Sequence, residues 1–117
     1  MNAHHSINYI EFPADDLMAV KKFYTEAFGW EFTDYGPEYI AFKDGVLEGG
    51  FTKGQASGEA GPLVILYSDN LESSMEGVVR AGGTIAKPIY PFPGGRRFHF
   101  RDPVGNHLAV WSEAEAA

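Results

Sequence analysis

The first half of the chain alternates short apolar runs with one helical stretch. From Ile7 to Phe12, apolar and polar residues alternate with a period of two, which predicts a strand that ends at Pro13. From Leu17 to Phe28, apolar residues recur every three or four positions, which predicts an amphipathic helix with Gly29 as its C-cap. Later apolar runs predict further strands, at residues 30–35, 39–42 and 46–52.

The second half repeats this order of elements. A buried strand is expected at 62–68, followed by a helix whose apolar face starts at Leu71. Residues 84–89 predict a strand, and the prolines and glycines of 91–95 predict a loop after it. The stretch from Phe98 to Trp111 predicts a hairpin with a tight polar turn. The predicted helix starts of the two halves match, as Asp16-Leu17 and Asn70-Leu71.

This repeated order predicts one domain, spanning residues 1–117, built from two βαβββ units. We expect the units at about 6–53 and 62–112, joined by a polar, Gly-rich linker at 54–61. Because a single unit leaves one sheet face uncovered, the two sheets are expected to lie side by side. The result is an α+β fold with one cupped, eight-stranded mixed sheet and its helices on the convex face. The concave face is then the default ligand site.

Composition and charge narrow the classes of function. The chain contains no cysteine, which excludes disulfides and cysteine-based zinc sites. A formal net charge of −7 without a basic stripe argues against nucleic acid and favours neutral or cationic small ligands. No apolar run is long enough for a membrane span and no secretory signal is recognisable, so a cytoplasmic protein is expected. His4 and His5 are interpreted as mobile N-terminal residues or a tag remnant.

Two stretches of the chain carry a family resemblance. They read PADDLMAVKKFYTEAFGW in the first half and PGGRRFHFRDPVGNHLAVW in the second. With the internal repeat, they resemble the vicinal oxygen chelate superfamily, which includes glyoxalase I, bleomycin-resistance proteins and extradiol dioxygenases. The resemblance implies a glyoxalase-like fold and a homodimer. For metal-dependent members it implies four inward His, Glu or Gln residues that hold a divalent ion, one from the first and one from the last strand of each unit.

The positions that match these four metal ligands carry other residue types. They are Tyr9, Gly49, Leu63 and Ala109, with Gly50 in place of Gly49 if the strand bulges. None of these side chains is a usual ligand for a divalent cation, and a catalytic zinc site needs about three protein ligands. The expectation is therefore no standard metal site and no cofactor.

Neighbouring polar residues leave alternatives open. If Tyr9 points into the cup, Glu11 does too, because side chains alternate along a strand, and His107 follows by the same rule. Glu11 as base and His107 as acid could perform metal-free acid-base chemistry, or both could join Glu48 in a displaced metal site. The plainer interpretation leaves Glu11 and His107 at solvated strand ends. His99 is expected at the rim or facing outward, not as a ligand.

Aromatic residues are the remaining candidates for the pocket wall, unless each simply fills the core. Stacking and cation–π contacts suit a planar or cationic small molecule. The leading hypothesis is a small-molecule binder of the bleomycin-resistance kind, without chemistry. The alternatives are a divalent-metal-dependent lyase or isomerase resembling glyoxalase I, and a metal-free enzyme using Glu11 and His107. With the carboxylate of Glu48, the expected ligand-binding residues are Tyr9, Tyr39, Phe51, Tyr67 and Trp111.

Overall fold

The computed structural model describes residues 3–53 and 61–113, and these contain eight strands and two helices. The chain divides into two compact units. The N-terminal unit spans Asn8–Leu63, and the C-terminal unit combines the residues up to Ile7 with the chain from Val64 onward. The linker expected at 54–61 lies outside the described residues, apart from Gly61.

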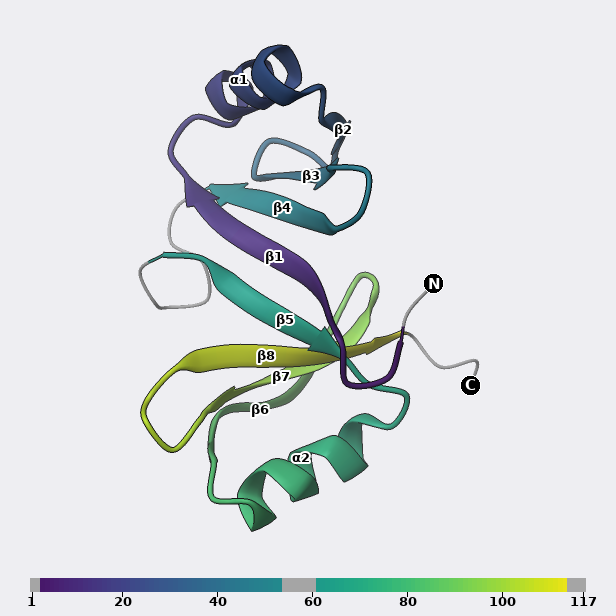
Figure 1. The fold of residues 1–117 in the computed structure, drawn as a ribbon, viewed down its shortest axis with the longest axis vertical. Coiled ribbons are helices and arrows are strands. Elements are labelled where there is room, and N and C mark those ends of the chain that lie inside the picture. The colour runs from purple at the N-terminus through teal and green to yellow at the C-terminus, as the bar shows by residue number, and fades with distance from the viewer. Residues whose placement is uncertain (1–2, 54–60, 114–117) are drawn as a thin grey trace. The chain divides into compact units, whose positions relative to one another are not determined.

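The N-terminal unit has the expected βαβββ order (Figure 1). Its elements are β1 (Ile7–Ala14), α1 (Leu17–Phe28), β2 (Glu31–Asp34), β3 (Tyr39–Lys43) and β4 (Glu48–Lys53). β1 and β4 pair in parallel, whereas β2 with β3 and β3 with β4 pair antiparallel. The strand order of this unit is therefore β2-β3-β4-β1.

α1 begins and ends where the sequence predicts. Asp16 Oδ1 accepts a hydrogen bond from the Ala19 N–H at 3.0 Å, and Gly29 takes a left-handed conformation with a φ of 74°. Leu17 is the buried residue of the helix. It joins the core of the unit, which also contains Ile40, Phe42 and Phe51 from β3 and β4. α1 therefore covers the sheet face to which these side chains point.

β1 extends beyond its predicted end at Pro13. Pro13 pairs with Thr52 of β4, and Ala14 pairs with Lys53. Proline removes one backbone donor but retains its carbonyl, so one proline does not stop the pairing. The expectation that Pro13 ends the strand is therefore wrong.

The C-terminal unit has the same order of elements (Figure 1). They are β5 (Leu63–Tyr67), α2 (Leu71–Arg80), β6 (Thr84–Phe92), β7 (Gly95–Arg101) and β8 (His107–Glu113). β5 and β8 pair in parallel, and β6, β7 and β8 pair antiparallel, in the order β5-β8-β7-β6. The repeat of the βαβββ unit is thus confirmed, down to the parallel pairing of its first and last strands.

α2 begins at Leu71, as predicted, and contributes to the second core. Asn70 Oδ1 accepts from the Ser73 N–H at 3.1 Å. Leu71 is 1% exposed and packs with Phe98 of β7 and Val110 of β8. α2 therefore covers the sheet face that carries these residues. Neither described helix is long and apolar enough to cross a membrane.

β6 continues into residues that the sequence assigned to a loop. It runs to Phe92, so Pro88 and Pro91 lie inside it. Its pairing with β7 shifts register twice between Ile85 and Tyr90. β6 is the last strand in the order of its unit, and edge strands tolerate prolines because they need fewer ladder donors.

The predicted turn between β7 and β8 is confirmed. Asp102 Oδ1 accepts hydrogen bonds from the backbone N–H of Val104 at 3.0 Å and of Asn106 at 2.9 Å. Hydrogen bonds from Asn106 are the main cause that lowers the pKa of the Asp102 carboxyl. Gly105 supplies the left-handed backbone conformation, with a φ of 96°.

Candidate functional site

Each unit has one sheet face covered by its helix and one face without a helix. In the N-terminal unit, Phe42 and Phe51 pack with Leu17 of α1. Side chains alternate along a strand, so the residues beside these two phenylalanines point to the opposite face. This helix-free face carries residues that align across β1, β3 and β4, namely Tyr9, Glu11, Tyr39, Glu48 and Gly50.

Three of these side chains form a hydrogen-bonded group. The hydroxyls of Tyr9 and Tyr39 lie 2.5 Å apart, and the Tyr39 hydroxyl donates to Oε2 of Glu11 at 3.0 Å. A phenol carries one O–H, and Tyr39 uses it to donate to Glu11, so the Tyr39 oxygen accepts the hydrogen bond that the Tyr9 hydroxyl donates. Glu11 is 7% exposed. Burial, and then the charge of Glu11, raise the pKa of the Tyr39 phenol far above its usual value, so Tyr39 stays protonated.

Two glycines of β4 lie beside this group. A Cβ on Gly50 would overlap the ring and hydroxyl of Tyr39, whereas a Cβ on Gly49 would overlap the Ile10 carbonyl oxygen and the Phe42 ring. Gly50 therefore shares the face of Tyr39, and Gly49 faces the side of α1. The inward position that was expected at Gly49 is therefore occupied by Gly50, whose backbone lies close to the Tyr39 phenol.

Phe51 lies on the helix-covered face. It is 3% exposed, stacks on Phe12 with ring centroids 5.3 Å apart, and packs with Leu17. The expectation that Phe51 lines the pocket is corrected: alternation with Gly50 turns its ring into the core. Glu48, by contrast, is exposed and stands opposite Tyr9, on the helix-free face.

In the C-terminal unit, two expected aromatic residues meet on the face opposite α2. The rings of Tyr67 and Trp111 contact edge to face, with centroids 5.1 Å apart. The Tyr67 hydroxyl donates to Oε1 of Glu113 at 3.0 Å. Phe92 of β6 also contacts Trp111 edge to face, with ring centroids 6.2 Å apart.

His107 belongs to a chain of side chains on the same face. Its Nε2 lies 2.9 Å from Nδ1 of His99, whose Nε2 lies 2.9 Å from the Tyr90 hydroxyl. Nε of Arg97 donates to the same hydroxyl. Lys87 Nζ lies 4.2 Å from the centroid of the Tyr90 ring. These residues come from β6, β7 and β8.

His99 faces away from Phe98 and Phe100, as alternation predicts, but it is not at the rim. It is 1% exposed, and the expectation of a rim or outward position is wrong because Tyr90 of β6 and His107 of β8 contact its ring. Burial, and then the charge of Arg97, lower the pKa of His99 to about 4. The imidazole is therefore neutral at neutral pH.

The two predicted acid-base residues thus acquire partners that sequence reasoning missed. Glu11 belongs to the N-terminal unit and is bonded to Tyr39, whereas His107 belongs to the C-terminal unit and is bonded to His99. The alternation of His99 with Phe98 and Phe100 correctly predicts that His99 lies on the sheet face opposite these two phenylalanines. The hydrogen bond between Tyr90 and His99 could not be predicted, because the register shifts of β6 are not visible in the pattern of apolar residues.

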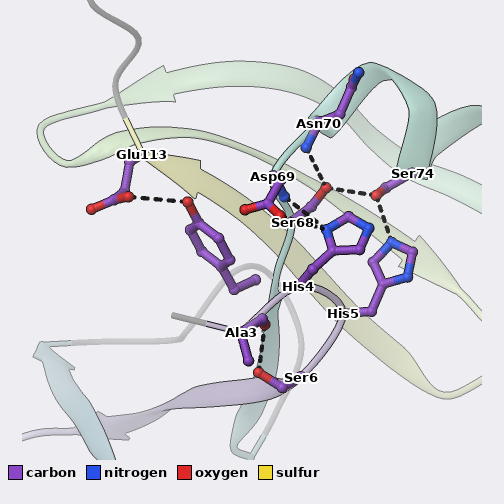
Figure 2. Close-up of polar contacts among 10 residues, drawn as sticks. Ala3, His4, His5, Ser6, Ser68, Asp69, Asn70, Ser74 and Glu113 are labelled. Carbon is purple, nitrogen blue, oxygen red and sulfur yellow. Dashed lines mark hydrogen bonds and ion pairs between the residues drawn. The ribbon is translucent and has the colours of Figure 1, made fainter. Parts of the chain in front are cut away.

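The N-terminal histidines are held by hydrogen bonds (Figure 2). Nδ1 of His4 accepts from the backbone N–H of Asp69 at 2.9 Å, and Nε2 of His5 lies 2.9 Å from the Ser74 hydroxyl. The Ser74 hydroxyl is in turn 2.7 Å from that of Ser68. The interpretation of His4 and His5 as mobile residues is therefore corrected: both imidazoles join the loop before α2 and its first turn.

The residues at the family's metal positions do not fit a divalent ion. Tyr9 is engaged with Tyr39, Gly49 and Gly50 carry no side-chain donor, and Leu63 and Ala109 are apolar. Among the described residues, no group of three or more His, Asp or Glu side chains could hold a metal ion.

Comparisons with known proteins give the family. A family model described as Glyoxalase/Bleomycin resistance protein/Dioxygenase superfamily matches residues 6–110. The chain is 25% identical to "Putative glyoxylase CFP32" of Mycobacterium bovis, over 89% of this chain and 44% of that protein. It therefore spans less than half the length of the curated relatives that it matches.

Solved structures show the same fold at low identity. The Mn(II)-bound glyoxalase from Novosphingobium aromaticivorans matches with a TM-score of 0.68 at 21% identity, over 100% of this chain and 43% of that one. A glyoxalase/bleomycin resistance protein/dioxygenase superfamily member from Vibrio splendidus matches with a TM-score of 0.70 at 15% identity, over 92% of this chain and 100% of that one. The expected class, paired βαβββ units with an eight-stranded mixed sheet, is thus confirmed. On the family model, the repeat and the fold together, this chain belongs to the glyoxalase/bleomycin resistance protein/dioxygenase superfamily.

Proposed function

We propose that this protein binds a small, planar molecule, neutral or cationic, on the helix-free face of its N-terminal unit. The observation that carries this proposal is the group formed by Tyr9, Tyr39 and Glu11. Two phenol rings offer stacking surfaces, and a carboxylate beneath them favours positive charge. The exposed carboxylate of Glu48 adds negative charge on the same face.

The side chains at the four positions that match the family's metal ligands favour binding without a metal ion. The four positions that match the family's ligands offer a phenol already in a hydrogen bond, a glycine and two apolar side chains. A divalent ion needs imidazole, carboxylate or carboxamide ligands that these positions lack. On the C-terminal unit taken by itself, the edge-to-face pair of Tyr67 and Trp111 is proposed as an aromatic surface that suits a planar molecule.

The test compares charge at constant shape. Proflavine, a planar three-ring cation, and resorufin, a planar three-ring anion, are titrated into the protein by calorimetry, with elemental analysis of the same sample. We expect proflavine to bind and resorufin not to bind. Glu11→Gln should weaken proflavine binding about tenfold, because a desolvated cation–carboxylate contact contributes one to a few kcal/mol.

The matched control is Tyr35→Phe, which changes a tyrosine that is 65% exposed. It should leave proflavine binding unchanged, whereas Tyr39→Phe should weaken it. Equal binding of both dyes, or an unaltered affinity in Glu11→Gln, would contradict the proposed ligand class. A stoichiometric divalent metal in the purified protein would instead favour the metal-dependent lyase or isomerase.

A further inference from the structure

Two serine hydroxyls of the C-terminal unit form a line that ends on an imidazole (Figure 2). The Ser68 oxygen accepts from the backbone N–H of Asn70 at 3.0 Å and lies 2.7 Å from the Ser74 oxygen. The Ser74 oxygen lies 2.9 Å from Nε2 of His5. Ser68 is 0% exposed, Ser74 is half-buried and His5 is exposed. The line therefore runs from a dry end to an end that a solute can reach.

Burial fixes the direction of the first hydrogen bond in this line. The Ser68 hydroxyl has one proton to donate. Within the part of the chain that the structure describes, its oxygen meets one donor, the Asn70 N–H, and one possible acceptor, the Ser74 oxygen. Because a buried donor without an acceptor is costly, Ser68 donates to Ser74. The Ser74 oxygen thus already accepts one hydrogen bond before His5 is considered.

The second hydrogen bond then runs from Ser74 to His5. If Nε2 of His5 carried the ring proton, the Ser74 oxygen would receive two donors, and its own proton would meet no acceptor among the described side chains. With the ring proton on Nδ1, Ser74 donates to the lone pair of Nε2, and both hydroxyl protons of the line are bonded. The Ser74 hydroxyl is therefore placed as a nucleophile is placed beside its base.

The backbone of His5 is held in the position that this contact needs. Its N–H donates to the Tyr67 carbonyl oxygen at 2.6 Å, and the Tyr67 N–H donates to the carbonyl oxygen of Ser6 at 2.9 Å. His5 has a φ of 60°, a left-handed conformation that it alone adopts among the described non-glycine residues. Backbone strain of this kind persists where the surrounding structure fixes it, and it clusters at functional sites. The imidazole is therefore held from its own backbone as well as by Ser74.

We propose that Ser74 is a nucleophile for small acyl donors, with His5 as its general base. The Ser74 oxygen attacks the carbonyl carbon of an activated ester as its proton passes to Nε2 of His5. A new C–O bond forms, the bond from the carbonyl carbon to the leaving oxygen breaks, and its electron pair departs with that oxygen. Ser74 is left as its acyl ester, and the exposed imidazolium of His5 releases a proton to water.

The reactivity of Ser74 does not depend on the ligand proposed for the N-terminal unit, and the neighbouring Ser73 provides an internal control. The full chain is treated with p-nitrophenyl acetate, and peptide mass spectrometry measures the initial rates of acetylation at both serines. Ser73 is exposed, so access alone would favour it over the half-buried Ser74. We expect Ser74 to react at least about tenfold faster than Ser73, because general-base assistance contributes about a hundredfold or more in a matched site.

His5→Gln keeps a side chain that can accept a hydrogen bond but is not a base. It should remove the rate advantage of Ser74 and leave the Ser73 rate unchanged. A Ser74 rate at or below that of Ser73 in the native protein would overturn the proposal, and this comparison does not require the variant to fold. An unaltered advantage in His5→Gln, or an acetyl group on His5 in place of Ser74, would overturn the role of His5 as the base.

Discussion

Tyr39 shows how one residue is constrained from several sides. Its hydroxyl accepts from Tyr9 and donates to Glu11, and its ring fills the space that a Cβ on Gly50 would need. Alternation along the strands is sufficient to predict that Tyr9 and Glu11 share a face. It is not sufficient to predict the hydrogen bonds, because these depend on the pairing of β1 with β4 and of β4 with β3, which join segments distant in sequence.

At this scale we predict that Tyr39→Phe lowers the free energy of unfolding by about 1–2 kcal/mol. The variant keeps the ring but leaves Glu11 without its phenol donor, and the loss of one partner of a buried polar pair costs about that much. Urea denaturation measures the change. Tyr35→Phe, at an exposed ring, should change stability by less than about 0.5 kcal/mol. Equal effects of the two substitutions would contradict the buried bond.

At the scale of the elements, the local sequence predicts the ends of the helices better than the ends of the strands. Both helices begin at the predicted starts, where Asp16 and Asn70 cap them, since a cap depends on residues two or three positions away. Strand ends were less predictable. Pro13 and Pro91 both lie inside strands, because the effect of a proline depends on its neighbours in the sheet and not on the local sequence.

Glycines in a strand and in a helix should respond in opposite directions. Gly49→Ala in β4 should lower stability by about 3 kcal/mol, because the added methyl overlaps the Ile10 carbonyl oxygen and the Phe42 ring. Gly77→Ala in α2 should raise stability by about 0.5–1 kcal/mol, because the nearest atom, on Arg80, is 3.9 Å away and alanine favours the helix. Thermal denaturation of both variants tests this; a loss of stability in Gly77→Ala would contradict the open helix surface.

For the whole molecule, the repeat and the family resemblance predicted the class of fold, and the family model confirms the membership. The net charge of the whole chain predicts the local charge of each unit less well. The net charge of −7 favours a cationic ligand, and Glu11 and Glu48 agree with that in the N-terminal unit. The C-terminal unit instead gathers Lys87 and Arg97 around Tyr90, which a sum over the sequence does not reveal.

Acid should destabilise the molecule in a defined range of pH. The pKa of His99 falls from 6.5 to about 4 on folding, so between these values the unfolded chain binds a proton that the folded one does not. Stability should therefore decrease as the pH falls from 6.5 to 4 and should level off below that, a loss of about 3 kcal/mol. Urea denaturation across this range measures it. His99→Gln should remove this part of the slope, and an unchanged slope would contradict the buried neutral imidazole.

The aromatic contacts of Trp30 and of Trp111 have a practical consequence for fluorescence. Trp30 stacks between Tyr24 and Phe42 in the N-terminal unit, with centroids 4.5 Å from each, and Trp111 contacts Tyr67 in the C-terminal unit. Because the sequence contains two tryptophans, replacing either by phenylalanine leaves one emitter that reports on one unit. Coincident denaturation curves from the two single-tryptophan variants would mean that the repeats melt as one cooperative body, and separate curves would mean that each half keeps its own stability.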